Sequence, residues 1–510
     1  MDKYPVKERG SHDEFRSHGD VTGIGAASAR RAIEPPASIG AMSYDYRVSF
    51  ERKLVQKIDF RLLPMVIIMY IMNYLDRNNI ATARLAGLED ELQLTSAQFQ
   101  LAVSILFVGY VLMQVPSNLL LNKIGRPSIY LSTCMVVWGL VSTLTGTVNS
   151  YGGLVAVRFA LGFVEAAYFP GCLYFLSCWY TRKELGFRTA ILYSGSLISG
   201  AFSGLITAGV ADGMDGARGL RAWRWIFYIE GAITIVIAIA AAFILPNFPR
   251  TTKWLSEEER ELAIYRLEED IGMDDWTGSA DQTFWHGFKL AITDIKVFIL
   301  AIQLTAVVNA ASITNFFPTV VETLGYNPIP TLLLTAPPYV LAVITSFLNA
   351  WHADRTGERY RHISLPLLVG IAAFILASAT TAVAPRYVAM MLMLSGIYPS
   401  YVVILGYISN CIPRPPSKRA ASLAFINAVS NCAQIWASYL YPKSAGPRYA
   451  VAMSVNCATL FVALVMATIL YFMLQRLNKK LDRGEHVDGV MSSGGAVPEE
   501  AAGKGFRFLL

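Results

Sequence analysis

Long apolar runs recur along this chain between two polar ends. Each run has about 20 residues or more, which is enough for a helix to cross a hydrocarbon core of about 30 Å. We count twelve such runs and expect each to be a transmembrane helix. The approximate spans are 61–80, 97–121, 128–148, 152–178, 188–210, 226–246, 297–319, 331–351, 363–384, 387–410, 419–440 and 450–474.

The polar breaks predict how the chain is divided. The longest interior break separates the apolar runs into six and six. Within it, Ser256 is followed three residues later by Glu259, a capping box that predicts an amphipathic surface helix. The predicted parts are a disordered cytoplasmic tail at 1–55, a six-helix bundle at 56–246, a cytoplasmic linker at 247–295, a second six-helix bundle at 296–476 and a cytoplasmic tail at 477–510.

Composition excludes most soluble classes of protein. Hydrophobic residues make up 54% of the chain and charged residues only 16%, whereas a soluble domain carries about 25% charged residues. This excludes a nucleic-acid binder, a soluble enzyme and a disordered chain as the main interpretation. The six cysteines all lie in apolar runs, so no disulfide framework is expected. The first 50 residues or so hold no apolar core of a secretory signal peptide.

Lysine and arginine in the short loops predict the orientation, because cytoplasmic loops carry an excess of both. With both termini in the cytoplasm, the inner loops hold Lys123, Arg126, Arg182, Lys183, Arg188, Arg355, Arg359, Arg361, Arg414, Lys418 and Arg419. Two outer loops, at 145–151 and 323–331, hold none, whereas the segment 218–224 is a basic exception. The bias favours cytoplasmic termini.

A loop motif occurs twice, at the same place in each half. The loop after the second span contains Asn122, Gly125 and Arg126, and the loop after the eighth contains Asp354, Gly357 and Arg359. Both fit the frame G-x-x-x-D-x-x-G-R-R, with Asn122 in the place of the acid. This repeat resembles the cytoplasmic loop signature of the major facilitator superfamily. The resemblance implies an all-α membrane protein with two six-helix bundles around a central cavity, and these six residues would form gating loops.

Charged residues deep in the predicted membrane region occur only in the first half. Asp76 and Arg77 end the first span, and Arg158 and Glu165 lie in the fourth. A charge in a lipid core costs several kcal/mol, so such groups face a cavity or a partner. Arg158 and Glu165 are seven residues apart and share one helix face.

Two interpretations of these charges remain open from sequence. Arg77 and Arg158 both fall in the outer half and can meet one anionic ligand, because the guanidinium fork matches a carboxylate. Glu165, and with it Asp76, is then a candidate proton carrier. Alternatively, Arg158 and Glu165 form structural ion pairs with other helices, and Asp76 and Arg77 form a solvated helix end.

The second half offers polar but uncharged side chains away from its helix ends. We take Asn315, Asn427 and Asn431 as candidate ligand contacts. Taken singly, each is also explained by hydrogen bonds that pack membrane helices together.

Several segments resemble the anion:cation symporter family, most closely its fungal allantoate permease branch. They read NYLDRNNI at 73–80, RFALGFVEAAYFPG at 158–171, WRWIFYIEG at 223–231, NFFPTVVETLGY at 315–326 and RAASLAFINAVSN at 419–431. The resemblance covers residues 55–475. It implies proton-coupled transport of a small organic anion, such as a nicotinate-, allantoate- or pantothenate-like carboxylate. Arg77 and Arg158 would contact the anion and Glu165 would couple the proton. It further implies a plasma membrane location and, by analogy, a monomer.

Other functions are weighed against this one. Export of a secondary metabolite and nutrient sensing without transport remain alternatives. A membrane enzyme would need a catalytic cluster, but the six histidines lie in tails, loops or loop edges, and none are spaced as a ligand pair. An ATP-driven pump would need the motif G-x-x-x-x-G-K-[ST], which is absent. No cofactor, metal or nucleic-acid partner is expected.

Overall fold

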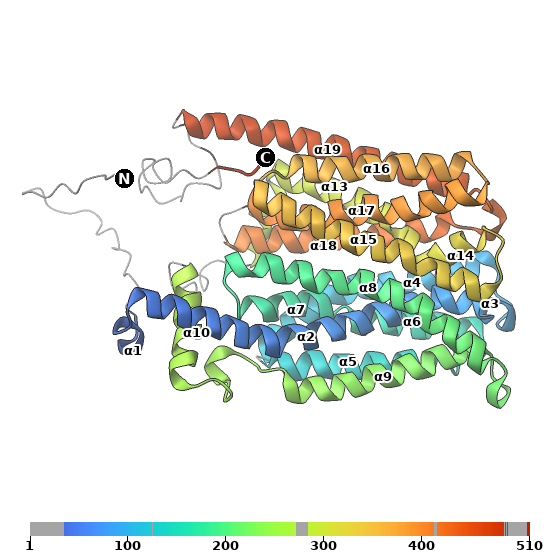
Figure 1. Cartoon of the computed structure of the whole chain (residues 1–510), viewed down its shortest axis with the longest axis horizontal. Coiled ribbons are helices and arrows are strands. Elements are labelled where there is room, and N and C mark those ends of the chain that lie inside the picture. Colours follow the sequence, from blue (N-terminus) through green and yellow to red (C-terminus); the bar gives the residue numbers. More distant parts are fainter. Residues whose placement is uncertain are drawn as a thin grey trace, which may run out of the picture.

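The computed structural model describes residues 35–124, 126–271, 284–412, 416–483, 485, 487 and 507–510. This part of the chain is helical and contains no strand. The long helices run side by side along one axis (Figure 1). One end of the bundle holds α10 (Glu257–Ile271) and the other holds α3 (Leu88–Glu91). We refer to them as the α10 end and the α3 end.

Six spans make up the first half of the bundle. Within it α5 packs on α6 and α9, α4 on α6, and α2 on α8 and α9. The helices are α2 (Tyr44–Leu85), α4 (Ser96–Ile124), α5 (Pro127–Thr145), α6 (Tyr151–Glu165) followed by α7 (Tyr168–Ser177), α8 (Arg182–Met214) and α9 (Ala222–Ile244).

Six further spans make up the second half. Here α16 packs on α17 and α19, α13 on α18 and α19, and α15 on α17. The helices are α13 (Ile295–Ala311) continued by η3 (Ser312–Phe316) and α14 (Phe317–Glu322), α15 (Pro328–Thr356), α16 (Tyr360–Ala379), α17 (Val383–Cys411), α18 (Pro416–Ala437) and α19 (Ala450–Asp482). The short elements are α1 (Ala37–Gly40), η1 (Ala217–Gly219), η2 (Pro249–Thr251), α12 (Phe284–Ile292), η4 (Ser438–Leu440) and η5 (Lys443–Ala445).

The predicted helical membrane fold is confirmed, with one span of a different character. In the described residues, eleven helices are long and apolar enough to cross a membrane. The twelfth predicted span, 419–440, corresponds to α18, which is a helix but a more polar one. It carries serine, asparagine and glutamine along its length and packs against α13, α12 and α4. α18 belongs to the second half but also packs against α4 of the first, and its described serine, asparagine and glutamine side chains are buried or half-buried.

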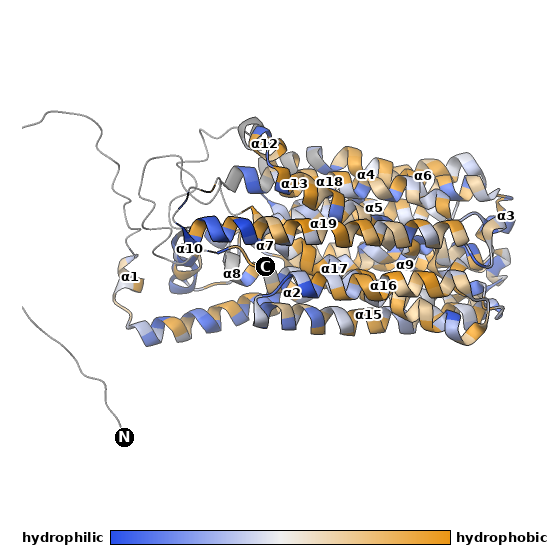
Figure 2. Ribbon diagram, turned by 90° about the horizontal axis from the view of Figure 1, so that it is seen from above, coloured by the Kyte–Doolittle hydropathy of each residue, from blue (hydrophilic) through white to orange (hydrophobic). Residues whose placement is uncertain are grey.

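The tails are shorter than predicted. Residues 44–55, which we expected in the first tail, form the start of α2, and α19 continues to Asp482. At the chain end, Phe508 is buried and exchanges hydrogen bonds of 2.9 Å with the Asn478 side chain. Hydrophilic residues gather at the α10 end, whereas apolar residues predominate along the middle of the bundle (Figure 2). Polar extensions of membrane helices therefore account for part of both predicted tails.

The linker helix α10 is bound to the first half. The predicted capping box is confirmed: Ser256 Oγ accepts from the Glu259 amide at 3.2 Å, and Glu259 Oε2 accepts from the Ser256 amide at 2.9 Å. Glu259 also pairs with Lys57 of α2 at 2.7 Å, and the buried Arg266 pairs with Glu184 of α8 at 2.8 Å.

Close helix packing in the first half depends on a glycine. A Cβ added to Gly162 of α6 would lie 1.9 Å from the carbonyl oxygen of Leu106 in α4. A Cβ added to Gly152, in the same helix, would meet no atom within 4 Å. The backbones of α4 and α6 can approach this closely only where one helix lacks a side chain.

We therefore expect Gly162→Ala to destabilise the protein by about 1–3 kcal/mol, the usual cost of overpacking a well-packed interior. Thermal unfolding of the purified protein in detergent measures this effect as a lower melting temperature. Gly152→Ala is the matched control and should leave the melting temperature unchanged or slightly higher. Equal melting temperatures for the two variants would show that the α4–α6 contact tolerates a methyl group.

Candidate functional site

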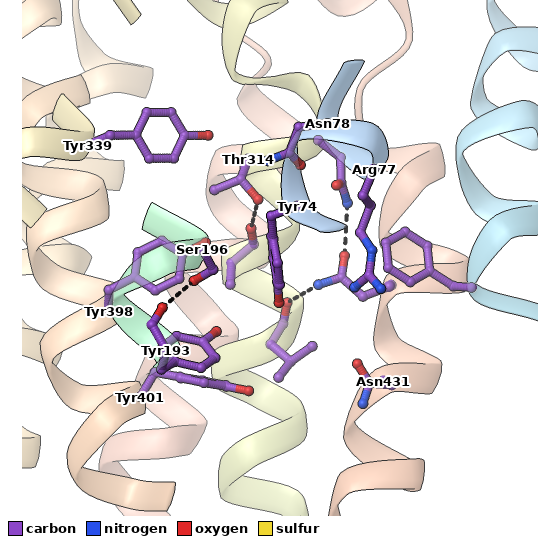
Figure 3. Close-up of a pocket in the computed structure, with 15 residues that line it drawn as sticks. Tyr74, Arg77, Asn78, Tyr193, Ser196, Thr314, Tyr339, Tyr398, Tyr401 and Asn431 are labelled. Carbon is purple, nitrogen blue, oxygen red and sulfur yellow. Dashed lines mark hydrogen bonds between the residues drawn. The ribbon is translucent and has the colours of Figure 1, made fainter. Parts of the chain in front are cut away.

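A cavity lies between the two halves, and side chains from both line it. About 590 Å³ of space, including space open to solvent, lies among its lining atoms. Figure 3 shows the lining side chains. The lining residues are Tyr74, Arg77 and Asn78 of α2, Phe107 of α4, Tyr193 and Ser196 of α8, Val308 and Ala311 of α13, Thr314 and Asn315 of η3, Tyr339 of α15, Tyr398 and Tyr401 of α17, and Asn431 and Gln434 of α18.

Arg77 is the only charged side chain among the described residues that line this cavity. It is 8% exposed, and both its Nε and its Nη2 lie 3.0 Å from Oε2 of Glu165. Its guanidinium carbon lies 4.8 Å from the ring centre of Tyr110 and 5.0 Å from that of Tyr74. One carboxylate and two aromatic faces thus hold the guanidinium at the cavity wall.

Glu165 lies behind Arg77 and does not line the cavity. It is the last residue of α6, where the span is interrupted before α7 begins. Its side chain is fully buried, and among the described residues its Oε1 has no hydrogen-bond partner. The structure therefore pairs Glu165 with Arg77 across two helices.

Arg158, the second arginine predicted to contact a ligand, does not line the cavity. It is 1% exposed, and its Nε and Nη2 donate to backbone carbonyls, of Ala102 at 3.3 Å and of Arg77 at 3.4 Å. Arg158 and Glu165 share one face of the helix, but neither side chain lines the cavity.

Asp76 is directed away from the cavity. It is fully buried and accepts hydrogen bonds from Ser142 Oγ at 2.6 Å and Thr234 Oγ1 at 2.9 Å. The alternative interpretation of Asp76 and Arg77 as a solvated helix end is wrong, because α2 continues for two more turns and both side chains are buried.

Two of the three asparagines predicted in the second half line the cavity. Asn315 Nδ2 donates to Oε1 of Gln434 at 2.9 Å, so both amides are held at the wall. Asn431 also lines the cavity, whereas Asn427 does not and instead accepts from Asn431 Nδ2 at 3.0 Å. This wall therefore contains two hydrogen-bonded pairs, Asn315 with Gln434 and Asn431 with Asn427. Asn427 supports Asn431 without lining the cavity itself.

Sequence reasoning missed two features of this region. The first is a set of five tyrosines in the cavity wall, from α2, α8, α15 and α17, which apolar runs do not distinguish from core residues. The second is Glu230, 1% exposed in α9. It lies a few residues inside the predicted sixth span, within the segment WRWIFYIEG that carries the family resemblance, and no role is predicted for it from sequence. The one signal that could have identified Glu230 from sequence is that a carboxylate falls inside a predicted membrane span.

The predicted gating loops are only partly described. Asp354 pairs with Arg359 at 2.8 Å, and Gly357 ends α15 with a φ of +73°, a conformation that favours glycine. Arg126 precedes α5 and is exposed, whereas Gly125 and the side chain of Asn122 lie outside the described residues. Nearby, tertiary structure joins two histidines that sequence spacing did not: His352 Nδ1 lies 2.6 Å from His362 Nε2.

Contacts between the halves gather between the cavity and the α3 end. Ser104 Oγ of α4 donates to the carbonyl of Ile435 in α18 at 2.9 Å. Arg84 of α2 pairs with Glu89 at 2.7 Å, and Glu89 pairs with Lys443 of the second half at 3.0 Å. Burial opposes ionisation of Glu89, but its hydrogen bonds and charge interactions with Arg84 and Lys443 outweigh this and hold its pKa below the usual range.

The model of the Major Facilitator Superfamily matches residues 66–438, most of the chain. The chain belongs to the major facilitator superfamily. It is therefore a multi-pass membrane transporter and not an enzyme.

Related proteins agree with this assignment. The MFS-type transporter cnsO of Penicillium expansum is 34% identical over 444 residues, covering 84% of each chain. A protein of Agrobacterium vitis whose name assigns it, provisionally, to tartrate transport is 31% identical over 383 residues, covering 75% of this chain and 82% of its own.

Solved structures of the superfamily share the fold. The xylose transporter XylE of E. coli, in a partially occluded inward-open conformation, aligns with a TM-score of 0.63 at 15% identity, over 80% of this chain and 97% of that one. A bacterial homologue of the lysosomal transporter Spinster aligns with a TM-score of 0.61 at 18% identity, over 85% and 98%.

The ion pairs of Glu89, one of which joins the two halves at the α3 end, predict a pH dependence. The lowered pKa of Glu89 means that its ion pairs stabilise closure above the ordinary carboxyl pKa of about 4.3 and are lost as pH falls through the lower folded value. Glu89→Gln should remove this contribution at neutral pH. Such a pair is worth about 1 kcal/mol, a roughly fivefold change in the ratio of closed to open molecules.

Spin labels at Asp90→Cys and Tyr326→Cys, in a background without the native cysteines, measure the distance between the halves at this end. We expect a longer-distance population in Glu89→Gln at neutral pH, and in the otherwise unchanged protein once the pH falls below the lowered pKa of Glu89. Glu91→Gln is the control, because Glu91 pairs with Arg224 inside the first half at 2.9 Å. An unchanged distance distribution in Glu89→Gln would contradict a closing role.

Proposed function

We propose that this transporter carries a small organic anion together with a proton, by alternating access, across the plasma membrane. The observation that carries the proposal is the position of Arg77, a single buried cation on the wall of a central cavity, held from behind by Glu165. The resemblance to the anion:cation symporter family, its allantoate permease branch included, supports this function, as does the tartrate assignment of the Agrobacterium relative.

The ion pair of Arg77 and Glu165 gives a physical route by which proton binding is coupled to anion binding. While Glu165 is ionised, its Oε2 accepts a hydrogen bond from Nε of Arg77 and forms an ion pair with Nη2. A proton taken up by Glu165 neutralises that carboxylate and leaves the Arg77 charge without its counter-charge. An anion in the cavity then restores neutrality by binding the guanidinium fork. Proton and anion enter together because either one alone leaves a buried net charge.

The other lining residues indicate the kind of anion. One arginine matches one carboxylate, and among the described residues no second cation lines the cavity. Six aromatic rings surround it, and those of Tyr193 and Tyr401 lie 4.9 Å apart. Flat rings stack well on such walls, and the amides of Asn315, Asn431 and Gln434 can bond a polar ring atom. Of the three carboxylate types considered, we infer the nicotinate-like one, a ring-bearing monocarboxylate.

The basic loops and a second cavity suggest how the protein is oriented in the membrane. The basic loops lie at the α10 end, which we assign to the cytoplasm with both termini. A smaller cavity between α8 and α15, lined by Ala190, Ser194, Phe347 and Ala350, lies toward that end. The cavity would then be closed to the outside and accessible from within, in a monomer.

Uptake assays test the proposal. In cells lacking their own carriers, we expect labelled nicotinate or benzoate uptake to rise at acid pH and collapse with a protonophore. Tartrate and open-chain ureido acids should be poor substrates. Arg77→Lys keeps the charge but loses the fork, and should weaken uptake at least about tenfold. The control is Arg355→Lys, at an exposed position on α15. Equal uptake of ring-bearing and open-chain acids would contradict the inferred class.

Glu165→Gln separates binding from coupling. The variant should still exchange labelled for unlabelled anion, because Arg77 remains free to bind it. It should lose accumulation driven by a proton gradient, since the amide cannot take up a proton. Accumulation retained in Glu165→Gln would place proton coupling at another group.

A further inference from the structure

A second buried polar cluster lies on the other side of α2 from the cavity. Four consecutive residues of this helix, 76–79, are polar and divide between two faces. Arg77 and Asn78 line the cavity, whereas Asp76 and Asn79 contact residues of α5 and α9. One helical turn thus connects the ligand cavity with a separate cluster that the proposed transport step does not use.

Glu230 of α9 is the centre of this cluster. It is 1% exposed, and its Oε2 accepts a hydrogen bond from Asn79 Nδ2 at 2.7 Å. Among the described residues, its Oε1 has no partner, and neither has Oδ1 of Asn79. The carboxyl group and the amide therefore face each other with one hydrogen bond made and two acceptor atoms left over.

A proton on Glu230 accounts for both unpartnered atoms. An ionised carboxylate can only accept, and so can the amide oxygen of Asn79, so the two oxygens repel each other. A proton on Oε1 turns that oxygen into a donor, and Oδ1 of Asn79 is an acceptor on the same hydrogen-bonded amide. The acid and the amide then form a pair in which each group donates once and accepts once. Buried polar atoms are almost always satisfied in this way.

Among the described residues, no hydrogen bond or ion pair joins Glu230 to a cation. From α2 the charged neighbour is Asp76, another acid. The sequence of α5 (Pro127–Thr145) contains no charged residue, and α8 carries charges only near its ends, up to Arg188 and from Asp212. On α9 itself, Arg224 lies almost two turns earlier and pairs with Glu91 at 2.9 Å.

The charges of the five buried groups that interact with one another across α2, α6 and α9 lead to the same result. This network comprises two cations, Arg77 and Arg158, and three carboxyl groups, those of Asp76, Glu165 and Glu230. With all three ionised, the network would carry a net negative charge in a low-dielectric interior, which costs several kcal/mol. Binding one proton removes that charge.

The three acids differ in how well the protein stabilises their ionised form. Glu165 pairs with Arg77, and Asp76 accepts two hydroxyl hydrogen bonds. Glu230 accepts one hydrogen bond, from a neutral amide. We propose that Glu230 holds a proton at neutral pH and that Glu230, Asn79 and Asp76 form a proton-binding site separate from the ligand cavity. This site is distinct from the proton carrier proposed at Glu165 and does not depend on which anion is carried.

Infrared spectroscopy of the purified full-length chain in an ester-free detergent tests the proposal without a ligand. We expect, at neutral pH, the carbonyl stretch of an un-ionised carboxylic acid, which shifts to lower frequency in D₂O. Isotope-labelled glutamate should shift this band, whereas labelled aspartate should not. Glu230→Gln should remove it, and Glu258→Gln, at an exposed position on α10, should leave it intact.

The same spectra can overturn the proposal. Absence of the band shows that no acid is protonated. Loss of the band in Asp76→Asn or Glu165→Gln places the proton on that residue instead. If Glu230→Gln does not fold, a glutamate band that persists in both other variants still identifies Glu230, and its absence there refutes the assignment.

Stability gives a second readout. Glutamine copies the protonated acid, because its oxygen accepts from Asn79 and its amide donates to Asn79 Oδ1. Glu230→Gln should therefore melt within a few degrees of the unchanged protein, whereas Glu230→Ala, which leaves Asn79 without a partner, should melt clearly lower. A large loss in Glu230→Gln would show that the ionised form is the native one.

Discussion

A charge removed from water must meet an opposite charge or a set of hydrogen-bond partners, and this constraint organises the first half of the protein. Arg77, Arg158, Asp76, Glu165 and Glu230 are all buried there, on helices α2, α6 and α9. Each of them holds a neighbouring helix: Glu165 joins α6 to α2, Asp76 joins α2 to α5 and α9, and Arg158 bonds the backbones of α4 and α2. The position of α2, and with it one wall of the cavity, follows from these contacts.

The two halves therefore contribute different chemistry to one cavity. The first half supplies a fixed charge, whereas the second supplies amides and tyrosine hydroxyls at the facing wall. Placing the cation on one side only lets the second half move relative to it without breaking buried ion pairs, because the described ion pair between the halves lies at the α3 end, where Lys443 is half exposed.

Small residues decide how closely the helices approach. A side chain at Gly162 would collide with α4, and side chains at Gly200 and Gly204 of α8 would collide with Tyr339 and Thr335 of α15. The contact of α8 with α15 crosses between the halves. Glycine at these two positions lets α8 and α15 approach closely across the boundary between the halves.

The sequence by itself determined the membrane class, the twelve helical spans, the division into two halves and four of the five charged residues buried deep in the first half, all but Glu230. These properties depend on local composition and helix period, which a single chain segment contains. Only the tertiary structure decided which side chains form ion pairs and hydrogen bonds with each other. Sequence spacing placed Arg158 and Glu165 on one face and set Asn427 beside Asn431, yet Glu165 pairs with Arg77, and Asn427 supports the wall without reaching the cavity. The meeting of Asn79 with Glu230, 151 residues apart, depends on how α2 packs against α9. Helix rotation and tilt set these contacts, and both arise from packing against all neighbouring helices at once, which no single helix encodes.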